Sequence, residues 1–89
     1  MHFIGWNTFG AWLKSLREHE SISQKGLADA LGCHRIHIWR LENGKRRPSK
    51  IFLRSLEQRC SFTQHDRMML IAFEQMIEYR CDQVEVEKE

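Results

Sequence analysis

The sequence lacks several features that identify common classes of protein. None of its apolar runs approaches the roughly 18 residues that cross a membrane. The seven residues before the first predicted helix are too few for a signal sequence, so neither membrane insertion nor export is expected. The three cysteines, Cys33, Cys60 and Cys81, are odd in number and have no close paired spacing. This pattern predicts free thiols in a reducing cytoplasm.

Signatures of catalysis and metal binding are also missing. The sequence has no nucleophile motif, no glycine-rich phosphate loop and no paired carboxylates outside helix surfaces. Cys33 and His37 are the available nucleophile–base pair, but they are expected near a turn without a pocket. Together with His34 they form a short Cys/His cluster, whereas a structural metal site needs four ligands. We therefore expect no enzymatic activity, no cofactor and no metal.

The charge of this 89-residue chain is unevenly distributed, although the net value is only +2. From Arg35 to Arg59 there are eight cations and two anions, a net charge of +6, whereas the segment from Asp82 onward has four acids and one lysine. A basic middle attracts polyanions. The length allows one domain.

The stretch from residue 23 to residue 48 is predicted to form two short helices joined by a tight turn at Gly32. The second helix covers about residues 34–42, where Ile38 and Leu41 have the spacing of one buried face. Gly44 is expected to end this helix, because glycine adopts the left-handed conformation at little cost.

Two strings in this stretch carry a family resemblance. The first is S-Q-x-x-L-A-x-x-L-G, from Ser23 to Gly32, and the second is I-x-R-x-E-x-G-x-R-x-P, from Ile38 to Pro48. Residues 8–60 resemble the helix-turn-helix of the Xre or Cro/CI type, which lambdoid phage repressors and many small bacterial regulators share. The resemblance implies an all-α, five-helix lambda-repressor-like domain that binds double-stranded DNA.

In this family the second helix of the motif enters the major groove and presents its outer side chains to base edges. The resemblance assigns base contacts to Arg35, Ile36, Trp39 and Arg40. Ile36 and Trp39 depart from the polar residues usual at these positions. Two interpretations stay open for them, contact with thymine methyl groups or docking of a protein.

Phosphate contacts are expected at the start of the first motif helix, from two histidines of the second, and in the cationic loop that follows it. The expected set is Gln24, His34, His37, Asn43, Lys45, Arg46 and Arg47. A solvated loop is the alternative for the charge run. The resemblance also implies an ion pair between Arg17 and Glu42, where the alternative is a solvated arginine.

Helices also flank the motif. Residues 8–20 form an amphipathic helix that begins at Thr8, residues 50–59 form another, and residues 64–81 form the last, which begins with a capping box at Thr63 and Asp66. The apolar residues of the last helix cover an arc of about 220°, wider than one domain requires. We expect a homodimer, with contacts at Met68, Met69, Ala72, Met76 and Tyr79. The alternative is a helix clamped in its own domain with help from the apolar N-terminal arm.

These predictions divide the chain into a DNA-binding domain with its arm (1–62), a C-terminal helix for dimerisation (63–81) and a disordered acidic tail (82–89). We expect a cytoplasmic, nucleoid-associated repressor that binds an inverted repeat as a homodimer. The alternative is an antitoxin or other protein-binding module, in which the last helix and the acidic tail engage a protein partner.

Overall fold

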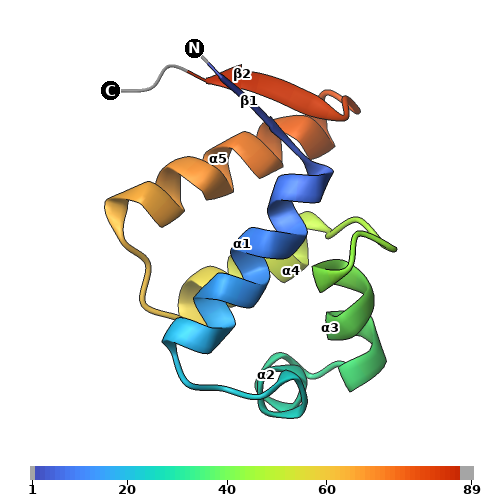
Figure 1. Ribbon diagram of the computed structural model, residues 1–89, viewed down its shortest axis with the longest axis vertical. Coiled ribbons are helices and arrows are strands. Elements are labelled where there is room, and N and C mark those ends of the chain that lie inside the picture. Colours follow the sequence, from blue (N-terminus) through green and yellow to red (C-terminus); the bar gives the residue numbers. More distant parts are fainter. Residues whose placement is uncertain (1, 87–89) are drawn as a thin grey trace.

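The computed structural model describes residues 2–86, which form five helices and a small two-stranded sheet (Figure 1). The elements are β1 His2–Gly5, α1 Trp6–His19, α2 Gln24–Leu31, α3 Arg35–Glu42, α4 Lys50–Arg59, α5 Gln64–Glu78 and β2 Gln83–Val86. The all-α prediction is confirmed for the helical body. Within the described residues, no helix has the length and apolarity that a membrane span requires.

Side-chain caps explain why three of the helices begin where they do. Ser23, Ser49 and Thr63 each accept a hydrogen bond from a backbone N–H of the first helical turn, at 2.9, 3.1 and 3.1 Å. At Thr63 the bond is reciprocated, because Asp66 accepts from the Thr63 N–H at 2.9 Å. The predicted capping box is therefore present, with Asp in the place usually held by Glu.

The first helix begins earlier than the sequence indicated. Gly5 is its N-cap, and Thr8, the predicted cap, lies in the third helical position. There its hydroxyl accepts from the Gly5 N–H at 3.4 Å. The helix is three residues longer at this end, which brings Trp6 against the core, where its ring stacks on Phe73 at 6.1 Å between centroids.

One hydrophobic core joins all five helices and the sheet. Phe9 and Phe73 lie at its centre and meet edge to face, with ring centroids 5.0 Å apart. Full burial of such a side chain contributes about 1.5–3 kcal/mol. The other fully enclosed residues come from α1 to α5, namely Leu13, Leu27, Ile38, Leu41, Leu53, Leu56 and Met76.

Gly10 permits the closest approach in the molecule between α1 and α3. A Cβ at this position would lie 2.4 Å from the carbonyl oxygen of Glu42 and 3.0 Å from that of Leu41. No side chain fits at this distance from two backbone oxygens. Gly10 therefore sets how closely the end of α3 lies against α1.

The two ends of the described chain form the sheet, which corrects the predicted acidic tail. β1 and β2 are antiparallel, with Phe3 opposite Glu85 and Ile4 opposite Val84. Ile4 is buried against the core and Phe3 is exposed, so one face of this terminal sheet packs inward. The prediction of disorder is wrong for residues 83–86; residues 87–89 lie outside the described part. Alternating Val84 and Glu85 fit a strand with one buried face.

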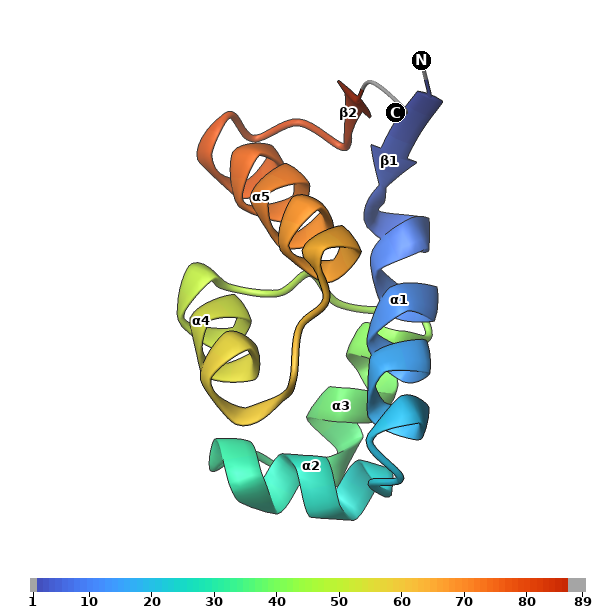
Figure 2. The ribbon, with the colours of Figure 1, turned by 90° about the vertical axis from the view of Figure 1, so that its left-hand side faces the viewer.

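The terminal sheet also accounts for the wide apolar arc of α5. Figures 1 and 2 both place the sheet against α5, at the opposite end of the molecule from α2. Of the predicted dimerisation residues, Met69, Ala72 and Met76 are buried in the chain's own core, so this set needs correction. Met68 and Tyr79 are exposed. The arrangement agrees with the alternative of a helix clamped with the help of the N-terminal arm.

Candidate nucleic-acid interface

The turn between α2 and α3 has the geometry that a helix-turn-helix requires. Gly32 ends α2 with φ = 71°, in the left-handed region, and the Cys33 N–H donates to the Ala28 carbonyl at 2.9 Å. His34 then caps α3, since its Nδ1 accepts from the Ile36 N–H at 3.1 Å. Glycine takes this turn without a steric cost. The sequence thus redirects the chain within three residues.

The two faces of α3 differ sharply in burial. Ile38 and Leu41 are fully buried against the core, as their spacing predicted. The other face is exposed, and Ile36 and Trp39 keep 47% and 46% of their surface in contact with solvent. The reading face defined by the predicted base contacts therefore lies open, and consists of Arg35, Ile36, Trp39 and Arg40. A protruding helix with such a face fits the major groove.

An ion pair whose side chains are largely enclosed ties α3 to α1. Arg17 donates from Nε to Glu42 Oε2 at 2.7 Å and from Nη2 to Oε1 at 3.2 Å, and its Nη1 reaches the Ile22 carbonyl at 2.9 Å. The side chains are 12% and 2% exposed. The hydrogen bond with Glu42 raises the pKa of Arg17, although burial acts in the opposite direction. This is the pair that the family resemblance implied.

Gln24, predicted to meet a phosphate, has its side chain on Glu42 instead. Its Nε2 donates to Glu42 Oε1 at 3.1 Å, so it completes the shell around that carboxylate. This contact joins residues 18 positions apart, and the sequence carried no signal for it. Gln24 still begins α2, where free backbone N–H groups favour an anion.

The basic loop, Asn43–Arg47, follows α3 and is exposed throughout. Asn43 Nδ2 donates to the Trp39 carbonyl at 2.8 Å, and Gly44 takes φ = 70° as its position predicted. Lys45 and Arg46 extend from this turn beside the end of the reading face. Arg47 differs from them, because its guanidinium pairs with Asp82 and lies 5.8 Å from the centre of the Trp6 ring.

His37 is less available for a phosphate than the loop residues. It is half-buried, with its ring edge-on to Phe52 at 5.8 Å between centroids. Burial lowers the pKa of His37, and the positive charges of Arg46 and Arg40 lower it further. His34, by contrast, is exposed, and its Nε2 remains available for a contact while Nδ1 caps the helix.

Two hollows border the candidate interface. One, of about 560 Å³, lies between α1 and α3, and Asn7 and Lys14 from α1 face it together with Trp39. The other, of about 430 Å³, lies beneath the basic loop beside Trp6. Asn7 and Lys14 were not among the predicted site residues. Their helix precedes the motif in sequence, and its place beside α3 is a property of the fold.

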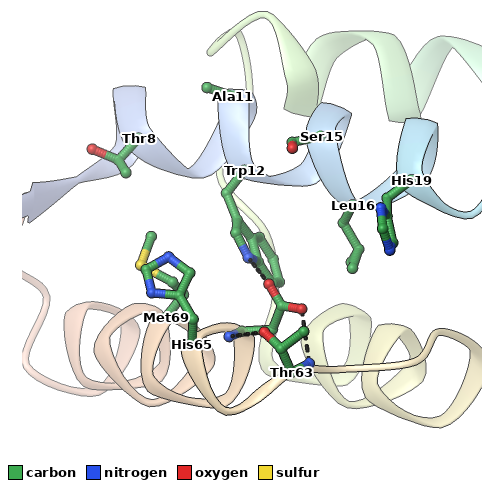
Figure 3. A pocket seen from close by; sticks show the side chains of 10 residues that line it. Thr8, Ala11, Trp12, Ser15, Leu16, His19, Thr63, His65 and Met69 are labelled. Atoms are coloured by element: carbon green, nitrogen blue, oxygen red, sulfur yellow. Dashed lines mark hydrogen bonds between the residues drawn. The ribbon is translucent and has the colours of Figure 1, made fainter.

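A third hollow lies away from the interface, between α1 and the start of α5 (Figure 3). Trp12 Nε1 donates to Asp66 Oδ1 at 3.0 Å across it, and none of its lining residues belongs to α2 or α3. Burial alone would raise the pKa of Asp66, but hydrogen bonds with Thr63 and Trp12 bring it below its ordinary value. This contact fastens α5 to α1.

The Cys33–His37 pair has no catalytic geometry. Within residues 2–86 no hydrogen bond joins the two side chains, and burial raises the pKa of the Cys33 thiol. A raised pKa disfavours the reactive thiolate. The described residues also contain no group of three or more His, Cys, Asp or Glu side chains placed to hold a metal.

Taken together, the glycine turn, the buried inner face of α3 and the exposed basic outer face define a DNA-binding helix-turn-helix domain. Comparison with known families agrees, because the family described as "Helix-turn-helix domain" matches residues 8–68. The chain belongs to this family, in keeping with its resemblance to the Xre and Cro/CI type. No curated protein matches the chain.

Proposed function

We propose that the protein is a sequence-specific transcriptional regulator that represses by occupying operator DNA in the cytoplasm. The observation that carries this proposal is the exposed reading face on a helix whose opposite face is fully buried. A rigidly held helix of this kind presents its side chains to base edges in a fixed register. Occupation of an operator requires no further domain.

Each part of the interface has its own role in this proposal. Arg35 donates two hydrogen bonds to guanine O6 and N7, which is worth about 1–3 kcal/mol of discrimination. Ile36 and Trp39 contact thymine methyl groups, and their exposure supports this assignment. Lys45 and Arg46 contact phosphates and supply salt-dependent affinity. His34, at the start of α3, donates from Nε2 to a phosphate.

We further propose a homodimer, with a contact surface revised to fit the burial of α5. At about 100° per residue, Met68, Ile71, Gln75 and Tyr79 fall within an arc of about 80°. All four are exposed. Ile71, which is 57% exposed, was absent from the predicted set. Two copies of this stripe, packed antiparallel, also bring Arg67 of one copy toward Glu78 of the other.

The DNA-binding proposal is tested by selection from random duplexes, followed by titration of the recovered sites by fluorescence anisotropy at several salt concentrations. We expect an inverted repeat whose half-sites lie about 34–36 Å apart. Arg35→Ala should relax one position in each half-site. Arg59→Ala, which removes an exposed arginine from the end of α4, should leave the recovered sequence unchanged. Binding without an enriched sequence would contradict the proposal.

The homodimer is tested by sedimentation equilibrium. Ile71→Glu places a charge in the centre of the exposed stripe and should shift the protein to monomer. Ile51→Glu makes the same change on α4, where Ile51 is 79% exposed, and should leave the dimer intact. A wild-type protein that is monomeric both free and on DNA would contradict this part of the proposal.

An antitoxin or other protein-binding module is the competing interpretation. It relied on an acidic tail free to cover a partner, whereas Asp82 contacts Arg47 and residues 83–86 are paired with β1. The exposed stripe of α5 is compatible with either interpretation. Because the described part of the acidic segment, residues 82–86, is engaged within the chain, the regulator is the function we prefer.

A further inference from the structure

Arg47 stands apart from its neighbours in the basic loop because it already holds an anion. Its Nη2 donates to Asp82 Oδ1, although the two residues are 35 positions apart in sequence. The guanidinium also lies over the ring of Trp6, which faces the same hollow. A carboxylate on one side and an aromatic ring on another fix the position of this cation.

The terminal sheet brings these three residues together. Gly5 pairs with Gln83 at the end of the sheet, so Trp6 and Asp82, which lie next to that pair in sequence, are held close to each other. Asn7, Gly44, Lys45 and Arg46 line the rest of the hollow, which measures about 430 Å³. The site therefore combines the end of the recognition motif with both ends of the described chain.

A phosphate and a carboxylate can bind this site in the same way, since both present anionic oxygens to the N–H groups of a guanidinium. The Arg47 and Asp82 side chains are 60% and 74% exposed, so solvent reaches the contact and the partners can exchange. Exposed pairs of this kind are weak. A backbone phosphate that approaches beside Lys45 and Arg46 is thus a direct competitor for Arg47.

We propose that Arg47 and Trp6 form a subsite for a DNA backbone phosphate, and that Asp82 occupies it in the free protein. DNA displaces the carboxylate, so Asp82 lowers the affinity for every sequence alike. This inference rests on the proposed DNA binding. It adds to the proposed interface Trp6, from the N-terminal segment, and Asp82, from the C-terminal segment, which competes with DNA phosphate for Arg47.

The test measures DNA affinity of the full chain by fluorescence anisotropy between 50 and 200 mM salt. Asp82→Asn frees Arg47 and should tighten binding about two- to fivefold at the lowest salt, as expected for an exposed pair of at most about 1 kcal/mol. Because DNA displaces Asp82 in the wild type as well, both proteins make the same phosphate contacts, and the slope of log K against log salt should be unchanged. Because phosphates carry no sequence information, the gain should be equal on the selected site and on a random duplex.

Two controls separate this effect from a change in net charge. Glu85→Gln removes the same charge from β2, where Glu85 makes no ion pair with residues 3–85, and should give a smaller gain in affinity. In an Arg47→Ala background, Asp82→Asn should have no effect on affinity. A melting temperature of Asp82→Asn within a few degrees of the wild type would show that the sheet is intact.

The outcomes distinguish the two proposals. If the wild type binds DNA and Asp82→Asn leaves the affinity unchanged, the Asp82 proposal is overturned while the proposed function stands. An equal gain from Glu85→Gln, or from Asp82→Asn without Arg47, would also overturn it. If the wild type binds no duplex DNA at all, both proposals fall.

Discussion

Two of the arginine–carboxylate pairs that link distant parts of the described chain have opposite surroundings. Arg17 and Glu42 are almost completely enclosed, and further hydrogen bonds from Arg17 to the Ile22 carbonyl and from Gln24 to Glu42 surround them. Arg47 and Asp82 face solvent, and within the described residues Asp82 has no other hydrogen-bond partner among the side chains. The same two chemical groups therefore serve different purposes in two regions.

The difference shows how burial decides what an ion pair can do. Removal of one partner from an enclosed pair strands a charge away from water, so such a pair is fixed once the protein has folded. An exposed pair loses little when it opens, because water replaces the partner. We infer that the first pair holds α3 in place, whereas the second remains exchangeable.

The largest expected effect compares these pairs directly. Glu42→Gln leaves the enclosed Arg17 without its counter-charge and should lower the free energy of unfolding by about 3–5 kcal/mol. Asp82→Asn, the matched change in the exposed pair, should lower it by less than about 1 kcal/mol. Urea denaturation followed by circular dichroism measures both. Equal losses in the two variants would break the distinction between the pairs.

A second, smaller effect on stability tests the close approach of Gly10 in α1 to the end of α3 at Glu42. Gly10→Ala introduces a Cβ that would lie 2.4 Å from the Glu42 carbonyl oxygen, so the two helices must separate. We expect a loss of about 1–3 kcal/mol, typical of an overpacked core. Gly26→Ala is the control, because its Cβ would meet side-chain atoms of Ile22 and Ser23 at 3.2 Å, and these can adjust. A Gly10→Ala protein as stable as the wild type would show that α1 and α3 are not held by this approach.

The smallest effect concerns the pH dependence of stability and involves His37. Its pKa is lowered from 6.5 by burial and by Arg46 and Arg40, while Phe52 packs on its ring. The unfolded chain therefore binds a proton more readily than the folded protein. The free energy of unfolding should be highest above pH 6.5 and fall as the pH is lowered through that value. His37→Gln should show a weaker decline between pH 7 and 5, and an unchanged decline would contradict this assignment.

The helical body and the buried face of α3 could be predicted because their signals are local. Caps at Ser23 and Thr63, the turn glycines and the spacing of Ile38 and Leu41 each act within about one helical turn. The Arg17–Glu42 pair came from the family resemblance instead. A residue pattern repeated across a family carries long-range information that a single helix does not.

The terminal sheet and its contacts could not be predicted in the same way. Four residues at each end of the described chain must meet across 77 intervening positions, and neither segment alone has a strong strand pattern. Because the sheet was not predicted, the wide apolar arc of α5 was interpreted as a contact surface for a second copy of the chain. Contacts such as Gln24 with Glu42 and Trp12 with Asp66 depend on how the helices pack, so they became visible only in the folded protein.

The strand pairing has one consequence for the connectivity of the fold. His2 and Val86 are partners in the register, so their backbones lie about 5 Å apart, the spacing of neighbouring strands. A short linker from residue 86 to residue 2 would therefore close the described residues into a ring without disturbing a helix. New ends opened at Ser61, between α4 and α5, would give a circular permutant in which the recognition helix and its supports are unchanged.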